Sequence, residues 1–282
     1  MHHNIFKLSL LSFALLLTSA TVAEAVSLEL FGDPIQEVVG TTSDIPVNSG
    51  GSSANFPSSA PLGSYAQFRV KKEGETNEFA QLRITYSGDN GVTDNKVMIA
   101  QTSDSQGLTD TGTASILLTL DQNAGSGEFT FNWYEPSVGG TSTTPKDLAV
   151  LYTTYDLDYN QQISFDSSEA QSITLDGSTK LTSTIDSTTE VYDGANSNSS
   201  FNEPKNAVQI LSENSASHTF SVGKHTDSGN ALYMFEFRDP SNNISFTNPN
   251  TQQVPFEFSP SLGLVVCGGL FGANKLRKRI AS

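Results

Sequence analysis

Residues 128–135 alternate aromatic and polar side chains and give the strongest strand signal in the chain. Successive side chains of a β-strand point to opposite faces, so Phe129, Phe131 and Trp133 share one face. A row of aromatic residues opposite polar ones is typical of a half-buried antiparallel strand. The alternative is an aromatic platform on which sugars stack. Core packing is favoured, because Trp133 is the only tryptophan and lies in the middle of the pattern.

The same two-residue period recurs along the chain in short segments rich in β-branched and aromatic residues. The further predicted strands cover residues 27–31, 65–70, 79–86, 96–100, 113–120, 148–155, 161–165, 172–175, 180–185, 207–211, 217–222, 231–237 and 243–246. Gly, Asn, Asp and Ser turns separate them, and no window shows a helical period with caps. This series of short strands predicts an all-β fold, an antiparallel β-sandwich of jelly-roll or immunoglobulin-like type.

Residues 1–25 have the order of a secretory signal peptide. Lys7 gives a weakly basic start, residues 8–17 form an apolar core, and the small residues at the end include Ala23 and Ala25. Export machinery reads this order, and an Ala-x-Ala ending marks the cleavage site. The sequence therefore predicts an N-terminal signal helix, export from the cytoplasm, and a mature chain that begins at Val26.

The end of the chain, residues 254–280, combines three features in a fixed order. A short motif of Pro255, Phe256 and Glu257 precedes an uncharged, mostly apolar run at 262–273. A basic cluster follows and consists of Lys275, Arg277, Lys278 and Arg279. Positive charges directly after an apolar segment stay on the cytoplasmic side. The apolar run is shorter than the roughly 20 residues of a comfortable membrane-spanning helix. We therefore expect a marginal C-terminal transmembrane helix, suited to a temporary stay in the membrane.

This tail resembles the C-terminal sorting signal of the PEP-CTERM family, in the PFE-CTERM variant typical of cyanobacterial surface proteins. Pro255, Phe256, Glu257, the glycine-containing apolar run and the basic cluster carry the resemblance. It implies recognition by an exosortase, a membrane-embedded protease that cuts near the motif. It also implies transient anchoring in the inner membrane, followed by residence at the cell surface or outside the cell. The resemblance covers the tail alone, so it concerns sorting and not the role of the exterior domain.

Between the two ends the sequence predicts one exterior domain. Residues 26–64 read as an N-terminal strand followed by a flexible Gly/Ser/Pro-rich linker, and residues 65–250 as the sandwich. Residues 193–202 are the best candidate for an internal boundary, but a single domain is preferred. The only cysteine, Cys267, lies in the tail, so the sandwich has no disulfide of its own.

The exterior part is strongly acidic. Lys7 and the four basic tail residues account for five of the fifteen basic residues, and Glu24 for one of the thirty acidic ones. Ten basic and twenty-nine acidic residues remain in 26–274, which is a formal net charge near −19. This excludes a general binder of nucleic acid, because phosphate contacts need a basic face. It suits an exterior protein that repels its neighbours or gathers cations.

Candidates for catalysis are few. The mature chain has two histidines, His218 and His225, and neither a catalytic triad nor a zinc site is indicated by this pair. Motifs of serine hydrolases, zinc proteases and phosphate-binding loops are absent from the sequence. Paired carboxylates of a glycosidase are not distinguishable among so many acidic residues. We therefore predict a protein without catalytic activity and without an organic cofactor.

One acidic cluster partly resembles a calcium-binding loop. Asp156, Asp158 and Asn160 place oxygen ligands at alternate positions after a predicted strand. The pattern departs from the loop where Gln161 replaces the glycine of the sharp turn, and Ser167 replaces the closing glutamate. A calcium site and a plain strand-to-turn transition both remain open for this segment.

Two classes of function are consistent with these features. The favoured one is a secreted, cell-surface or extracellular-matrix structural protein, sorted by its tail, with extracellular polysaccharide among its surroundings. The alternative is a carbohydrate-binding or calcium-dependent adhesive β-sandwich, and a secreted polysaccharide hydrolase is a distant third.

Overall fold

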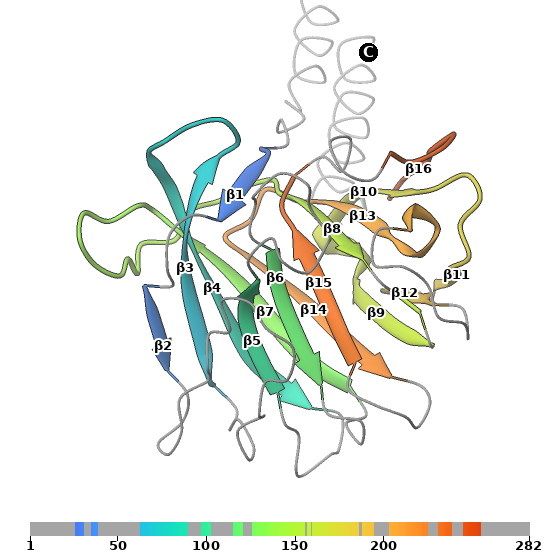
Figure 1. Cartoon of the computed structure of the whole chain (residues 1–282), viewed down its shortest axis with the longest axis horizontal. Coiled ribbons are helices and arrows are strands. Elements are labelled where there is room, and N and C mark those ends of the chain that lie inside the picture. The colour runs from blue at the N-terminus through green and yellow to red at the C-terminus, as the bar shows by residue number, and fades with distance from the viewer. Residues whose placement is uncertain are drawn as a thin grey trace, which may run out of the picture.

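The computed structural model describes residues 26–30, 35–38, 63–89, 97–102, 115–120, 126–155, 157–158, 160–185, 188–194, 203–224, 231–238 and 245–254. These residues form two antiparallel sheets (Figure 1). Apart from strands, the described residues contain two short 3₁₀ turns, η2 (Ser167–Glu169) and η3 (Pro204–Asn206). The predicted all-β antiparallel fold is confirmed.

The larger sheet has nine strands. Its spatial order is β1 (Leu28–Leu30), β3 (Tyr65–Lys72), β4 (Glu78–Asp89), β7 (Ser126–Tyr134), β14 (Ser217–Lys224), β9 (Gln161–Asp166), β12 (Thr189–Asp193) and β11 (Thr182–Ile185). The ninth strand, β2 (Gln36–Val38), also pairs with β3.

The smaller sheet has seven strands. Its spatial order is β16 (Asn250–Gln253), β10 (Ala170–Leu175), β13 (Val208–Ser212), β8 (Leu151–Tyr155), β15 (Ala231–Glu236), β6 (Ser115–Leu120) and β5 (Val97–Thr102). In Figure 1, β5, β6 and β15 of this sheet lie over β7 and β14 of the larger one.

The core lies between the two sheets and is rich in aromatic rings. Phe129, Phe131 and Trp133 of β7 are fully buried, which confirms core packing rather than an aromatic platform. The ring of Phe131 lies 5.7 Å from that of Tyr152 and 5.2 Å from that of Phe235, which belong to the opposite sheet. Edge-to-face and tilted contacts at such distances add to the stabilisation from burial.

The pairing of the strands is nested. β7 pairs with β14, β8 with β13, and β9 with β12, while consecutive strands from β7 to β10 alternate between the sheets. An antiparallel ribbon folded over on itself produces such nested pairs, with its strands divided between the two sheets of the sandwich. Along such a ribbon successive side chains point alternately toward the core and away from it. In β8 the outward side chains Thr153 and Tyr155 are buried as well.

A buried chain of hydrogen bonds links the two sheets inside the core. Trp133 Nε1 donates to the hydroxyl of Tyr152 at 2.8 Å, and that hydroxyl lies 2.9 Å from His218 Nδ1. His218 Nε2 lies 3.0 Å from the carbonyl of Glu213, which only accepts, so Nε2 carries the proton and Nδ1 accepts from Tyr152. Burial lowers the pKa of His218 from 6.5 to about 4, so the ring is neutral at pH 7.

The strand predictions differ from the structure in three short elements. β2, β12 and β16 carry weak patterns and were not predicted, and their partners in the sheets order them. The strand predicted at 243–246 is wrong in its described part, since 245–246 are not in a strand. The two sheets take in β1 and β2, which precede the predicted range 65–250, and β16, which extends beyond it to Gln253.

β16 is fastened to the end of β10. The backbone N–H of Thr247 donates to Asp176 Oδ2 at 2.6 Å, and Gly177 N–H donates to the carbonyl of Thr247 at 2.9 Å. A side chain at Gly177 would collide with the carbonyl of Asn248, so this close approach requires glycine. The last described residue, Val254, donates its N–H to the carbonyl of Gln171 at 3.0 Å.

Residues 1–25 and 255–282, where the signal helix and the transmembrane helix were predicted, lie outside the described residues. Within the part of the chain that the structure describes, no helix has the length and hydropathy to cross a membrane.

Candidate binding face

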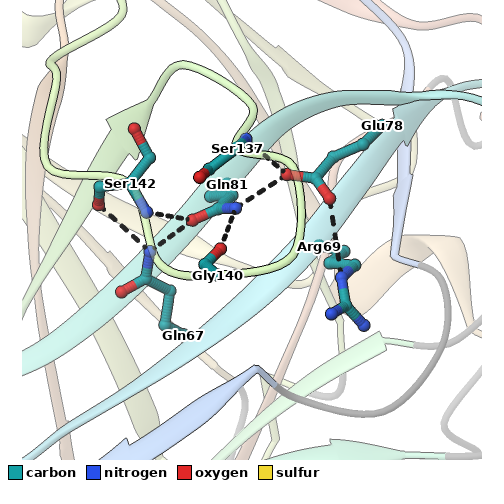
Figure 2. Close-up of polar contacts among 7 residues, drawn as sticks. All are labelled: Gln67, Arg69, Glu78, Gln81, Ser137, Gly140 and Ser142. Atoms are coloured by element: carbon teal, nitrogen blue, oxygen red, sulfur yellow. Dashed lines mark hydrogen bonds and ion pairs between the residues drawn. The ribbon is translucent and has the colours of Figure 1, made fainter.

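Two buried glutamines lie side by side on the outer face of the nine-stranded sheet (Figure 2). Gln67 of β3 donates from Nε2 to Gln81 Oε1 of β4 at 2.8 Å. Gln81 in turn donates from Nε2 to Glu78 Oε1 at 2.7 Å and to the carbonyl of Gly140 at 2.9 Å. Its Oε1 also accepts the N–H of Ser142 at 2.7 Å. Both amides are saturated, which is the usual condition for burying them.

These bonds attach the β7–β8 loop (135–150) to the sheet. Gly140 and Ser142 of the loop bind Gln81, and the N–H of Ser137 donates to Glu78 Oε1 at 3.2 Å. The other oxygen of Glu78 pairs with Arg69 Nε at 3.5 Å (Figure 2). Side chains of the sheet thus hold the loop over β3 and β4, and isolated bridges of Pro145 with Tyr134 and of Leu148 with Ser215 attach it further.

The glutamine pair also positions a cation, Arg83 of β4. Gln67 Oε1 accepts from Arg83 Nε at 3.1 Å and from Nη2 at 2.9 Å. The guanidinium lies 4.5 Å from the ring centre of Tyr65 and 5.0 Å from that of Tyr134, one ring on each neighbouring strand. Such stacking stabilises a planar cation and fixes its orientation.

The surroundings of Arg83 are polar and half-exposed. Asn132 of β7 is its direct partner in the sheet register, and Thr85 is paired with Tyr65. We call Tyr65, Arg83, Asn132 and Tyr134 the Arg83 face. It combines a rigidly held cation, two aromatic rings and an amide on a regular sheet.

Basic residues gather around this face. Five of the ten basic residues of 26–274 lie on β3, β4 and the β7–β8 loop, namely Arg69, Lys71, Lys72, Arg83 and Lys146. Arg69, Lys71 and Lys146 are paired with Glu78, Glu29 and Glu135 respectively. No ion pair between Arg83 and a described carboxylate is present, because its partner in the sheet is a neutral amide.

The predicted calcium ligands lie partly within the described residues. Asp158 is buried, and its carbonyl accepts the N–H of Gln161 at 2.7 Å to close a tight turn. Asn160 adopts the left-handed conformation with φ 61°, which replaces glycine in that turn. Asp156 lies outside the described residues, and the described ones contain no group of three metal-binding side chains. Calcium binding here stays a prediction.

The other predicted site residues lie outside the described residues. They are Ala23 and Ala25, Pro255, Phe256 and Glu257, and the basic cluster Lys275, Arg277, Lys278 and Arg279. The structure describes Val26, which follows the predicted signal cleavage point, and Val254, which directly precedes the predicted sorting motif. Val26 donates its N–H to the carbonyl of Ala149 at 3.2 Å and packs against the core, and Val254 is bound to Gln171.

The Arg83 face was missed in the sequence. Its signal is present, because Gln67, Arg69, Gln81 and Arg83 occupy the outward positions of two alternating strands. Amides and cations on a solvent face are ordinary, however, and only the register of β3 against β4 brings Gln67 opposite Arg83.

Comparison with known proteins identifies no family for the chain. No protein-family model matches it, and no curated protein matches it significantly. Among solved structures, the N-terminal domain of the Streptococcus gordonii adhesin Sgo0707 is similar at 11% identity and a TM-score of 0.40. That match covers 76% of this chain, and the chain spans 61% of that domain. The glucan binding protein C of Streptococcus mutans matches at 10% identity and a TM-score of 0.30, covering 72% of this chain and 68% of that one. At these values neither neighbour identifies a ligand or an activity of this chain.

Proposed function

We propose that the chain is an exported, non-enzymatic protein of the cell surface or extracellular matrix, and that its sandwich attaches to extracellular polysaccharide through the Arg83 face. The observation that carries the binding role is the held guanidinium of Arg83, which two buried glutamines and two tyrosine rings orient without a described counter-ion.

The physical basis is preorganisation. A binding surface gains affinity when its groups need no ordering on association. The side chains of the Arg83 face stand on adjacent strands, and Gln67 is itself held by Gln81. Aromatic and arginine side chains are also the residues that dominate binding energy in protein interfaces.

Retention of the full chain, purified in mild detergent, on polysaccharide affinity gels tests the binding role. We expect Tyr134→Ala to weaken retention, because the ring contributes contact area and keeps Arg83 in place. The matched control is Gln252→Ala, on the exposed edge strand β16 of the other sheet. Equal retention of both variants and the unaltered chain would exclude this face, and no retention on any polysaccharide would exclude the function.

Delivery to the surface is proposed from the two ends of the chain. The signal peptide directs export, and the tail holds the protein in the inner membrane until an exosortase-type protease cuts near Pro255, Phe256 and Glu257. Val254, the residue directly before this motif, is tied to β10 through its backbone N–H. The mature protein then lacks the segment after roughly Phe256, at a bond that the membrane–water boundary exposes.

Mass spectrometry of protein recovered from outside the cell tests the processing. We expect no peptide that ends in Ser282. Changing Lys275, Arg277, Lys278 and Arg279 to serine should let the chain pass unprocessed into the medium, because these charges resist transfer across the membrane. Recovery of the Ser282 peptide from the surface protein, with the processing enzyme present, would contradict the proposal.

Calcium is proposed as a second ligand, held by Asp156, Asp158 and Asn160. A ligand that binds only the folded state raises the melting temperature. Calcium-dependent adhesion by this segment therefore requires that calcium stabilise the chain through these residues, beyond any diffuse attraction to the acidic surface.

A further inference from the structure

We propose that the ligand of the Arg83 face is an acidic polysaccharide, whose carboxylate or sulfate group binds the free edge of the Arg83 guanidinium. This inference rests on the proposed polysaccharide binding and specifies the chemical class of the ligand.

The first argument is the way in which Arg83 is held. Gln67 Oε1 accepts hydrogen bonds from Nε and Nη2, on one side of the guanidinium. Nη1 has no hydrogen-bond partner among the described residues. The end of the fork formed by Nη1 and the second hydrogen of Nη2 is therefore available. A planar fork with two parallel N–H groups matches a carboxylate or sulfate group through two bonds.

The second argument is charge complementarity. The neighbouring cations Arg69, Lys71 and Lys146 are each neutralised by a glutamate. Arg83 is instead positioned by an uncharged amide, which orients the guanidinium without satisfying its charge. Neutral sugars would leave that charge without a partner, whereas an acidic sugar would supply one.

The acidic character of the whole chain does not prevent this interaction. Charges more than about 8 Å apart in solvent are largely screened at physiological ionic strength. The Arg83 guanidinium contacts the Gln67 amide and the rings of Tyr65 and Tyr134, and none of these groups is a carboxylate. The direct contacts of the guanidinium therefore place no negative charge against it.

Neighbouring groups suit the rest of a sugar. The phenol rings of Tyr65 and Tyr134 present polar hydroxyls as well as apolar surface, and Asn132 presents both an amide donor and an acceptor. Sugar hydroxyls donate and accept hydrogen bonds, so this mixture of groups fits them.

The test measures binding of the full chain in detergent to two matched pairs of polymers. Polygalacturonate is compared with its carboxyl-reduced form, and dextran sulfate with dextran. We expect tighter binding to at least one acidic polymer than to its neutral counterpart. Arg83→Gln should weaken that binding by roughly tenfold or more, since two charge-assisted hydrogen bonds are lost. Arg83→Lys should recover only part of it, because an ammonium lacks the planar fork.

Lys71→Gln is the matched control, since it removes the same charge from the same pair of strands but from a cation that Glu29 already neutralises. It should retain binding within about twofold of the unaltered chain. The melting temperature of each variant shows whether it folds. If Arg83→Gln does not fold, the binding of Arg83→Lys decides the test.

The possible results separate the two proposals. Equal binding to acidic and neutral polymers would overturn the acidic ligand and leave polysaccharide binding in place. Binding to none of the four polymers would overturn both. Equal losses for Arg83→Gln and Lys71→Gln would show diffuse attraction and overturn the Arg83 site. Preference for polygalacturonate assigns the anion as a carboxylate, and preference for dextran sulfate assigns it as a sulfate ester.

Discussion

Two arginines stand on opposite outer faces of the sandwich, and their charges have different partners: a carboxylate for one and a neutral amide for the other. Arg238, just after β15, is buried and pairs with buried Glu236 at 3.3 Å. Glu236 also accepts from Ser115 at 3.1 Å and from Tyr155 at 3.1 Å. Arg83 is half-exposed and is held by Gln67, a neutral residue.

The difference shows two uses of the same side chain. Burial makes an unpaired charge very costly, so Arg238 requires a carboxylate and Glu236 requires donors. Half-exposure lets water solvate Arg83, so an amide is enough to hold it. The first arrangement satisfies its charges internally and contributes to the fold, while the second keeps a charge oriented and available to a ligand.

The largest expected effect comes from breaking the buried ion pair of Glu236 and Arg238. Glu236→Ala leaves Arg238 buried without this partner and also removes an acceptor from Tyr155 and Ser115. We expect a loss of roughly 3–5 kcal/mol in the free energy of unfolding, measured with urea. Glu128→Ala, at an exposed glutamate of the other sheet, is the control and should change stability by about 0.5 kcal/mol or less. Similar values for both variants would contradict the contrast between the faces.

His218, which is buried in the core, gives a pH-dependent change in the free energy of unfolding of similar size. His218 has a pKa of about 4 in the folded chain and 6.5 as a reference value. Because the folded pKa is lower, its contribution to stability is complete above pH 6.5 and is lost as the pH falls toward 4. The expected loss between pH 7 and pH 4 is about 3 kcal/mol.

The control for that prediction is His218→Gln, which removes the titration. Burial raises the pKa of Glu169, Glu190 and Glu213, so their contributions change with pH in the opposite direction. The quantity to compare is therefore the difference in unfolding free energy between His218→Gln and the unaltered chain at each pH. A difference that does not vary with pH would show that His218 is not buried as a neutral ring.

An intermediate effect is expected at Gln81, which supports the Arg83 face through Gln67. Gln81→Leu leaves Ser142 N–H, the carbonyl of Gly140 and part of Gln67 without partners. We expect a loss of roughly 2–3 kcal/mol and faster amide hydrogen exchange at Ser142, because unsatisfied buried groups are costly. Gln162→Leu removes a half-buried glutamine bonded to Asp193 and should cost about 1 kcal/mol or less. If exchange at Ser142 is unchanged, the amide does not hold the loop.

The smallest effect is expected at Arg83 itself. Arg83→Gln should lower stability by about 1 kcal/mol or less, because water solvates the site and the new amide still donates to Gln67. Arg238→Gln should cost several times more, since it leaves Glu236 buried without its cation. Equal losses in thermal or urea unfolding would show that both arginines serve the fold and would remove the contrast.

The main strands were predictable because their signal is local. The inward positions of β4 and β7, such as Leu82, Ile84 and Phe131, alternate with polar residues, and the sheet buries them accordingly. β16 reads NTQQ, with all four side chains exposed, so no hydrophobic pattern marks it. It is a strand because its backbone pairs with β10, about 77 residues earlier in the chain.

For strands with a clear alternation, such as β4 and β7, the sequence by itself determined which side chains face the core, since a period of two is a property of the extended backbone. It also determined the acidic character of residues 26–274, and the order of residues at both ends on which the export prediction rests. Only the tertiary structure decided which outward-facing residues meet. Gln67 and Gln81 are 14 positions apart, and Ser142 lies 61 positions beyond Gln81. Strand register and the path of the loop bring such distant residues together, and neither is set by the local alternation of side chains.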